Sequence, residues 1–445
     1  MPPILALILC TIFVLFLLRL DHKQYPDASL ALWLPTLWVL IAMGKPLGVW
    51  FGISGATMEE GSPIDRNFLI LTLCLGFLII KKRNVNITGV LRQNISVVLL
   101  IGFLLISITW SDMPFISFKR WIKNLVPIIV ALIIASENDP RQALQCIFRR
   151  MIYVHIPFSY MLINYYSYLG RAYATSSGAL MWTGVCSQKN GLASLCMFAL
   201  FYFVWTFMRR RKGLDEPVVS YQKYIEIFLV LLSFYLFLGP NRTLTNSATA
   251  MAALAVALVS LFVLSWLKKR NIIIGANALT ILIMAIIIYG TVTPFLGGLT
   301  LFDPSAILNR DSQLTGRNYI WAFLVPYVMQ NPILGHGYGG FWTEAIRNAC
   351  YEYPAHNGYL ETLLDTGFIG LIFLSIFLIA NCRKAQKLMT LNFEWGVFWF
   401  CILLIAVTRN IAESAVMSLA EFWPAILFFM MTSLSSNISK QTERQ

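Results

Sequence analysis

Apolar runs with few charged residues, separated by short polar segments, recur along the whole chain. Each is long enough to cross or nearly cross a bilayer, where only a helix keeps its backbone polar groups bonded within the segment. The predicted spans are residues 3–20, 30–43, 68–80, 95–110, 125–136, 152–169, 192–208, 225–238, 248–267, 272–289, 360–380, 396–407 and 422–434. The pattern predicts an all-α, polytopic membrane helix bundle of about 12–13 transmembrane helices.

Composition agrees with a lipid environment. The chain is 58% hydrophobic and 12% charged, whereas soluble domains carry about 25% charged residues. We find no polar block large enough for a soluble domain, so residues 1–445 are interpreted as a single transmembrane domain. The first run has neither a basic residue ahead of it nor a small-residue cleavage site behind it, which predicts a retained helix instead of a signal peptide.

The net charge of +13 does not indicate a nucleic-acid partner, because the basic residues form short clusters between apolar runs. Such clusters mark cytoplasmic loops in membrane proteins. They are Lys81, Lys82, Arg83 and Arg92; Arg141, Arg149 and Arg150; Arg209, Arg210, Arg211 and Lys212; Lys268, Lys269 and Arg270; and Arg383, Lys384 and Lys387. Segments 111–124, 170–190, 239–247 and 291–357 are then expected outside.

Eight cysteines occur without the spacing of a metal site, so we expect no bound metal. Cys186 and Cys350 both fall in segments expected outside, where an oxidising compartment would permit a disulfide. Two free thiols are the favoured alternative, because sequence does not show that the two Cα atoms approach.

The segment 291–357 is far longer than an ordinary connection, and loops of this size tend to be functional. Thr315 is a plausible N-cap for an aromatic run that predicts a short helix lying at the membrane surface, with Trp321 and Tyr327 at headgroup level. The glycine-rich stretch from Gly335 to Phe341 predicts a flexible turn, and His356 precedes the next span.

Three motifs in and after this loop carry a family resemblance. They are Thr315–Gly316–Arg317–Asn318–Tyr319–Ile320–Trp321, the glycine turn 335–341, and His356–Asn357–Gly358–Tyr359–Leu360–Glu361. In order and spacing they resemble the O-antigen ligase and polymerase superfamily of bacterial envelope proteins. Weaker matches are 184–191 and 241–249. In the latter many relatives have a basic residue where this chain has Ala248.

The resemblance implies a GT-C-like glycosyltransferase of the bacterial inner membrane that is inverting, independent of metal and without a cofactor. It would transfer an undecaprenyl-pyrophosphate-linked glycan to an acceptor at the periplasmic face. A polymerase of exopolysaccharide or O-antigen repeats is slightly preferred over an O-antigen ligase that delivers glycan to lipid A–core. Expected partners are the acceptor glycan, membrane lipids and, as an open alternative, polysaccharide export or chain-length proteins.

Residue chemistry gives these motifs roles. Arginine bonds phosphate oxygens through its planar fork and keeps its charge, so Arg317 and Arg242 are predicted to bind the pyrophosphate. His356 is the predicted base, because a neutral imidazole accepts a proton near pH 7. Glu361, one helical turn beyond Asn357, either orients His356 or competes with it as base. Lys189 and Tyr338 are further predicted substrate contacts.

A polysaccharide transporter or lipid flippase is the alternative of another class. Transporters tend to have internal repeats, broken helices and ionisable residues near the bilayer midplane. Here the polar candidates collect at predicted outer span ends, which favours the enzyme. His336 is interpreted as a loop-surface residue, and Arg409 and Glu413 as a mutual ion pair.

Overall fold

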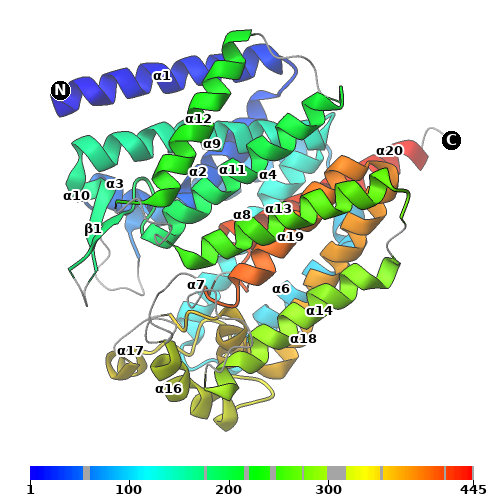
Figure 1. Ribbon diagram of the computed structural model, residues 1–445. Coiled ribbons are helices and arrows are strands. Elements are labelled where there is room, and N and C mark those ends of the chain that lie inside the picture. The colour runs from blue at the N-terminus through cyan, green and yellow to red at the C-terminus, as the bar shows by residue number, and fades with distance from the viewer. Residues whose placement is uncertain are drawn as a thin grey trace. The chain divides into compact units, whose positions relative to one another are not determined.

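In the computed structural model (Figure 1), described residues are 1–53, 61–174, 178–214, 220–240, 247–272, 275–297, 317–350, 354–414 and 417–442. Contacts between residues divide the chain into two compact units. Unit 1 comprises Met1–Thr72 and Glu137–Ala255, and unit 2 comprises Leu73–Ser136 and Val256–Gln445. Two of the three boundaries fall within helices α4 (Pro63–Lys82) and α13 (Ala248–Lys269), and the third lies between Ser136 and Glu137, outside any helix.

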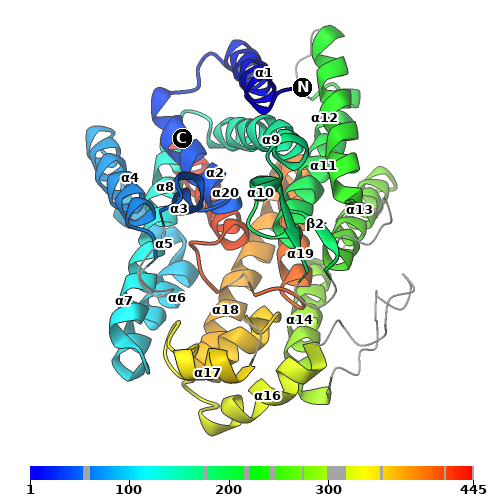
Figure 2. The same cartoon turned by 90° about the vertical axis from the view of Figure 1, so that its left-hand side faces the viewer.

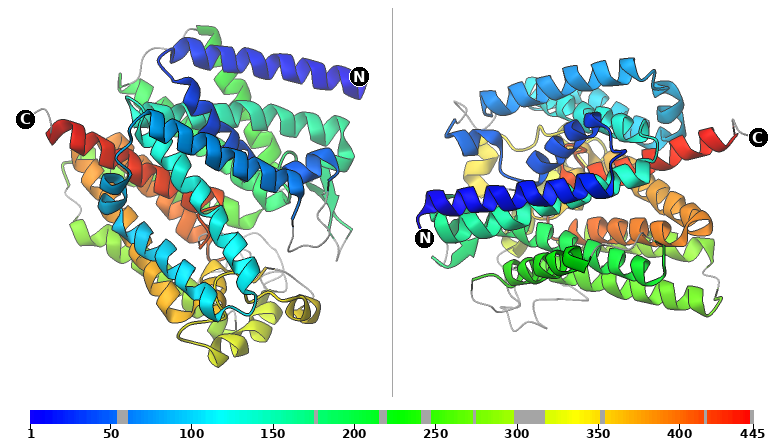
Figure 3. Two further views of the ribbon diagram at one scale, coloured as in Figure 1. Left: turned by 180° about the vertical axis from the view of Figure 1, so that it is seen from behind. Right: turned by 90° about the horizontal axis from the view of Figure 1, so that it is seen from above.

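Unit 1 is built around one long helix, α9. Its elements are α1 (Pro3–Gln24), η1 (Leu30–Leu32), α2 (Trp33–Met43), α3 (Leu47–Phe51), α9 (Pro140–Tyr165), α10 (Ser167–Gly170), the antiparallel strands β1 (Arg171–Tyr173) and β2 (Leu180–Trp182), α11 (Lys189–Arg211) and α12 (Ser220–Leu238). Helix α1 runs along α9, and α11 packs on α12 (Figure 3).

Unit 2 packs its helices on α18. Its elements are α5 (Ile87–Gln93), α6 (Ile95–Ile106), η2 (Ser107–Trp110), α7 (Pro114–Lys123), α8 (Leu125–Ala135), α14 (Ala276–Val292), η3 (Thr293–Leu296), α16 (Arg317–Gln330), α17 (Glu344–Cys350), α18 (Gly358–Leu391), α19 (Phe393–Arg409) and α20 (Phe422–Thr442). Helices α6, α14, α16, α19 and α20 all contact α18, and Figure 2 shows α16 and α17 near its start.

All thirteen predicted spans coincide with helices, which confirms the all-α membrane fold. Seven helices are long and apolar enough to cross a membrane by themselves, or up to eight if the pair Ile87–Gln93 and Ile95–Trp110, bent by 94°, is one span. The protein is therefore a multi-pass membrane protein. The remaining predicted spans lie on helices that are shorter or carry more charge.

One predicted cytoplasmic loop is instead helical. Helix α9 begins at Pro140, twelve residues before the predicted span, because the Asp139 side chain accepts hydrogen bonds from the backbone N–H groups of Arg141 and Gln142. The predicted loop residues Arg149 and Arg150 consequently lie on this helix, and both are buried.

Helix α18 is broken at Gly367, which has φ +61° and ψ −164°. The chain after α16 fills the break, since Pro332 O accepts from the N–H of Phe368 (2.8 Å) and Leu364 O accepts from the N–H of His336 (2.9 Å). A Cβ at position 367 would lie 2.3 Å from the Ile333 carbonyl oxygen, so only glycine fits there. The short first part of α18 is thereby tied to the loop.

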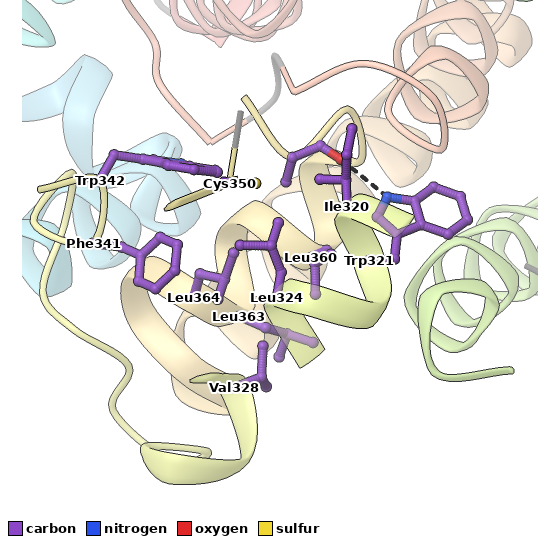
Figure 4. Packing of buried hydrophobic residues seen from close by; sticks show 11 residues of the cluster. Ile320, Trp321, Leu324, Val328, Phe341, Trp342, Cys350, Leu360, Leu363 and Leu364 are labelled. Carbon is purple, nitrogen blue, oxygen red and sulfur yellow. Dashed lines mark hydrogen bonds between the residues drawn. The ribbon is translucent and has the colours of Figure 1, made fainter. Parts of the chain in front are cut away.

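The predicted short helix is present as α16, described from Arg317 to Gln330, while the predicted N-cap Thr315 lies outside the described residues. The predicted headgroup position of Trp321 is wrong. Trp321 is 1% exposed and packs with Leu324 and Val328 against the first part of α18 (Figure 4). The apolar face of α16 therefore belongs to a protein core.

The glycine turn is packed tightly, contrary to the flexible turn that its composition predicted. Gly337 has φ +82°, and a Cβ there would lie 2.4 Å from Ser111 Cα. The Tyr338 N–H donates to Ser107 Oγ (3.1 Å), and the Arg120 guanidinium donates to Gly339 O. Glycine serves here for close approach of two backbones as well as for a left-handed conformation.

The cysteines are free thiols, in agreement with the favoured alternative. Cys186 lies in unit 1, where its Sγ is 3.2 Å from Met43 O. Cys350 ends α17 in unit 2 and is buried in the apolar cluster of Figure 4. Both are packing residues in the structure.

Candidate active site

The turn that carries His356 is held in an unusual conformation. His356 has φ +51°, one of three non-glycine residues with positive φ in the described chain. This left-handed conformation costs about 1–3 kcal/mol and persists only where the surroundings enforce it. The turn is enforced from both sides, because Ala355 O accepts from Trp321 Nε1 (3.0 Å; Figure 4) and the Asn357 side chain caps α18.

Glu361, in the first helical turn of α18, forms hydrogen bonds with the loop that carries His356. Its Oε1 accepts from Trp342 Nε1 (2.5 Å), and its Oε2 accepts from the Ala355 N–H (3.1 Å). Ser414 Oγ donates to Oε2 at a longer 3.5 Å. Both carboxylate oxygens thus accept from the protein, and the bond at Ala355 fixes the backbone beside His356.

Arg317 is brought to this region by an ion pair. Its Nη2 lies 3.8 Å from Glu413 Oε1, and the side chains are only 14% and 13% exposed. Glu413 immediately precedes Ser414, the residue that bonds Glu361. Arg317 and the His356 turn, about 40 residues apart in sequence, are therefore linked through two adjacent residues of the 410–414 segment.

The segment 410–414 is itself anchored to the start of α18. Asn410 O accepts from the Gly358 N–H (2.8 Å), and Asn357 Nδ2 donates to Gly290 O (2.9 Å) at the end of α14. A Cβ on Gly358 would overlap the Asn410 amide, which is the close approach that glycine permits. The predicted His–Asn–Gly motif thus acts as a junction of three chain segments.

Asp365, one turn beyond Glu361, supports the glycine turn. Its Oδ2 accepts from the Gly339 N–H (2.9 Å), and the residue is buried. Glu361 and Asp365, four residues apart on α18, therefore bind different parts of the preceding chain. Together they hold both loops on the short first part of α18.

Tyr338 is buried at 5% exposure, and its hydroxyl accepts from Asn124 Nδ2 (2.9 Å). Burial raises the pKa of Tyr338 above its usual value, so the phenol stays protonated. Asn124 Oδ1 also accepts from Ser418 Oγ (3.1 Å) and from the Ala420 N–H (3.2 Å). This position favours a supporting role for Tyr338; the predicted contact with substrate stays a prediction.

His336 is not the loop-surface side chain that the sequence predicted. Its side chain is 10% exposed, and Nδ1 lies 2.9 Å from Asp112 Oδ2. Nε2 lies 3.5 Å from Tyr327 O, and His336 O accepts from the Asp112 N–H (3.2 Å). The imidazole thus ties the glycine turn to the segment before α7.

The last two predicted substrate-binding residues, Lys189 and Arg242, are not found beside His356 in the described structure. Lys189 is the first residue of α11, and Arg242 falls in 241–246, outside the described residues. The loop before Lys189 is held by buried Lys45, whose Nζ donates to Gly184 O (2.7 Å) and to Cys186 O. Burial lowers the pKa of Lys45 to about 8.

Several contributors were missed by sequence reasoning. Trp342 and Ser414, which bond Glu361, and Lys45, which holds the loop before α11, carry no motif of their own. Only Glu413 had been singled out, as a partner for Arg409. Among the described residues, no group of three or more His, Cys, Asp or Glu side chains could hold a metal ion.

Comparisons with known proteins point to the same part of the chain. Residues 241–375 match the family model described as O-Antigen ligase. The chain is also 23% identical over 290 residues to the exopolysaccharide production protein ExoQ of Rhizobium meliloti (strain 1021), covering 62% of each protein. The alignment therefore spans less than two thirds of that relative. The matched family segment includes α16, the glycine turn, the His356 turn and the broken start of α18.

Proposed function

We propose that this chain, which belongs to the O-antigen ligase and polymerase superfamily by its match over residues 241–375, is a membrane glycosyltransferase. The donor is a glycan linked to undecaprenyl pyrophosphate, and the acceptor is a second glycan. The reaction takes place at the periplasmic face of the bacterial inner membrane. ExoQ, named for exopolysaccharide production, supports a polymerase as the first choice.

In the proposed reaction an acceptor hydroxyl attacks the anomeric carbon of the donor. His356 accepts the hydroxyl proton as the new C–O bond forms. The bond between the anomeric carbon and the pyrophosphate oxygen breaks, and undecaprenyl pyrophosphate leaves with the electron pair. A single displacement of this kind inverts the configuration at the anomeric carbon.

Arg317 is proposed to bind the pyrophosphate and to stabilise the charge that grows on it during departure. The Arg317 Nη2 lies 3.8 Å from Glu413 Oε1. This separation is longer than that of a hydrogen-bonded ion pair. Glu413 would then keep Arg317 in place through the catalytic cycle.

Glu361 is proposed as a positioning residue for His356. Both of its oxygens already accept hydrogen bonds, from Trp342 and from the Ala355 N–H, so a role as competing base is disfavoured. The observation that carries the proposal is this linkage of His356 and Arg317 through Glu361, Ser414 and Glu413. It supports two groups of complementary chemistry acting on one substrate.

A transporter is supported by one observation, the break of α18 at Gly367, since broken helices form the binding sites of many transporters. Here, however, the chain itself fills the break: the N–H of Phe368 in the helix donates to Pro332 O of the loop, and the N–H of His336 in the loop donates to Leu364 O of the helix. A substrate would have to displace these backbone bonds. The enzyme is therefore the better proposal.

The test is deletion of the gene in its host, followed by complementation with wild type, Arg317→Ala or His356→Ala. Single repeat units in the deletion strain identify a polymerase, and full-length polymer that stays on its lipid carrier identifies a ligase. Both variants should insert normally and fail to restore surface polysaccharide. Full complementation by both variants refutes the catalytic assignment and favours transport.

A further inference from the structure

Both nitrogens of the His336 imidazole, in the glycine turn, face hydrogen-bond acceptors. Nδ1 lies 2.9 Å from Asp112 Oδ2, and Nε2 lies 3.5 Å from Tyr327 O. A neutral imidazole carries one N–H and can donate to only one of these acceptors, whereas the charged form carries two N–H groups and can donate to both. The surroundings of His336 are therefore complementary to the imidazolium.

The acceptor that faces Nε2 belongs to the end of helix α16. Tyr327 lies in the last turn of this helix, which ends at Gln330. The carbonyl groups of a last turn carry partial negative charge, so a cation placed there is stabilised. Because 3.5 Å is long for a hydrogen bond, the interaction between Nε2 and Tyr327 O is chiefly electrostatic. It is therefore strong only while the imidazole is charged.

Other charged groups near His336 act in both directions. The Asp365 carboxylate on α18 interacts electrostatically with His336 and with Arg120 of α7. The Arg120 guanidinium donates to Gly339 O, in the same turn as His336. Asp112 and Asp365 thus favour the imidazolium, and Arg120 opposes it. The His336 side chain is only 10% exposed, so solvent screens these interactions little.

The backbone of His336 is already fixed on α18. Its N–H donates to Leu364 O (2.9 Å), and its carbonyl oxygen accepts from the Asp112 N–H (3.2 Å). The imidazole lies 5.2 Å from the Phe341 ring, which belongs to the apolar cluster between α16 and α18 (Figure 4). Loss of a proton from the side chain therefore leaves the turn in place and weakens its contact with the end of α16.

Helix α16 connects this contact with the candidate site. Arg317 is its first described residue, Trp321 donates from its ring nitrogen to Ala355 O, and Tyr327 lies in its last turn. The helix is thus held to the His356 turn by Trp321 and to the glycine turn by His336. Since a helix held at two points has a better defined direction than one held at a single point, the position of Arg317 depends on both contacts.

We propose that His336 in its charged form is a positioning residue, which holds the end of α16 on the glycine turn and thereby places Arg317 for the donor pyrophosphate. When the imidazole loses its proton, donor binding weakens. This inference rests on the proposed function for the role of Arg317. The contact between His336 and α16 is tested separately from it.

The test compares full-length wild type in detergent with His336→Lys and His336→Gln from about pH 5 to pH 8, the range in which histidine ordinarily changes its charge. Lysine stays charged and donates several N–H groups over this range, whereas glutamine stays neutral. Thermal unfolding reports the contact, and the dissociation constant of undecaprenyl pyrophosphate reports donor binding. His22→Gln is the matched control, since His22 is an exposed histidine on α1 in unit 1.

We expect wild type to resemble His336→Lys at about pH 5 and His336→Gln at about pH 8, in both midpoint temperature and dissociation constant. The difference between the two variants should not change with pH, because neither changes its charge. The dissociation constant of His336→Gln should exceed that of His336→Lys about two- to fivefold, the effect of one charge at a helix end. His22→Gln should follow wild type.

The proposal is overturned if wild type parallels His336→Gln at every pH, because the imidazole then carries no functional charge. It is also overturned if unfolding follows the expected pattern while all variants bind undecaprenyl pyrophosphate equally, since His336 is then only structural. If Arg317→Ala binds this lipid as well as wild type does, the proposed role of Arg317 fails, and unfolding still decides whether the contact exists. Asp112→Asn, which should reduce the pH dependence, replaces a histidine variant that does not fold.

Discussion

Replacing Glu361 by glutamine separates a positioning residue from a base. The glutamine keeps one acceptor oxygen, but its amide NH₂ must face either Trp342 Nε1 or the Ala355 N–H, both of which are donors. One hydrogen bond to a charged group is lost, worth about 1.5–3 kcal/mol. One hydrogen bond fewer then holds His356 in its strained backbone conformation, which has φ +51°.

Since each 1.4 kcal/mol changes a population about tenfold, the fraction of molecules with His356 in its functional conformation should fall about 10- to 100-fold. In a purified system with a polyprenyl-pyrophosphate-linked oligosaccharide, kcat should fall by this factor while the donor KM and the shape of the pH profile stay unchanged. Trp342→Phe, which leaves the bond between Glu361 and Ala355, should have a smaller effect. Glu344→Gln, an exposed carboxylate on α17, is the matched control.

Two results would refute this reasoning. If Glu361→Gln is as inactive as His356→Ala, Glu361 takes part in the chemistry as a base. If Glu361→Gln retains wild-type kcat, the hydrogen bonds to Trp342 and Ala355 do not hold the His356 turn in place. An intermediate loss with an unchanged pH profile fits only the positioning role.

Four further outcomes are expected. Arg317→Lys should keep partial activity and Arg317→Ala almost none, because lysine restores charge without the bidentate fork; equal activity of the two variants would argue against pyrophosphate binding. Gly337→Ala should lower stability by about 2–5 kcal/mol in thermal unfolding, from left-handed strain and overpacking on Ser111. Gly297→Ala, also at positive φ but with no atom of the described residues within 4 Å of the added Cβ, should lose only about 1–2 kcal/mol. Burial lowers the pKa of Lys45 from 10.5 to about 8, so the folded state releases this proton first and the stability of wild type relative to Lys45→Met should rise between about pH 8 and pH 10; a difference that is flat with pH contradicts this. Finally, EDTA should leave glycosyl transfer unchanged, as the resemblance implies, and loss of activity restored by added divalent cation would refute the metal-free reaction.

Local hydrophobicity predicted the helices well, because a span needs only its own apolar length. It could not predict how α16 packs. The aromatic face of that helix is equally suited to lipid or to protein, and the structure buries Trp321 against a helix that begins about 40 residues later. The break at Gly367 left only a weak signal, the polar pair Asp365–Thr366 ahead of the glycine in an otherwise apolar run.

At the site, the sequence indicated which residues have suitable chemistry, but not which residues hold them in position. Arg317 and His356 stood out through a motif, whereas the turn geometry at His356 depends on Trp342, Ser414 and a backbone N–H. Arg149 was interpreted as an orientation signal, and its partner Asp21 is 128 residues away. Contacts between distant segments are set by packing, which no local pattern encodes.

The break in α18 has a consequence for how the protein is made. The loop that fills the break precedes α18 in the chain, so it has left the ribosome before the helix is complete. An N–H at Phe368 or Ile369 that faced hydrocarbon without a partner would cost several kcal/mol. Only Pro332 O and Ile333 O from the loop supply those partners in the structure described here. Correct insertion of this helix is therefore coupled to docking of the loop, and a molecule whose loop has not docked presents an unsatisfied backbone to the membrane, where quality-control proteases can recognise it.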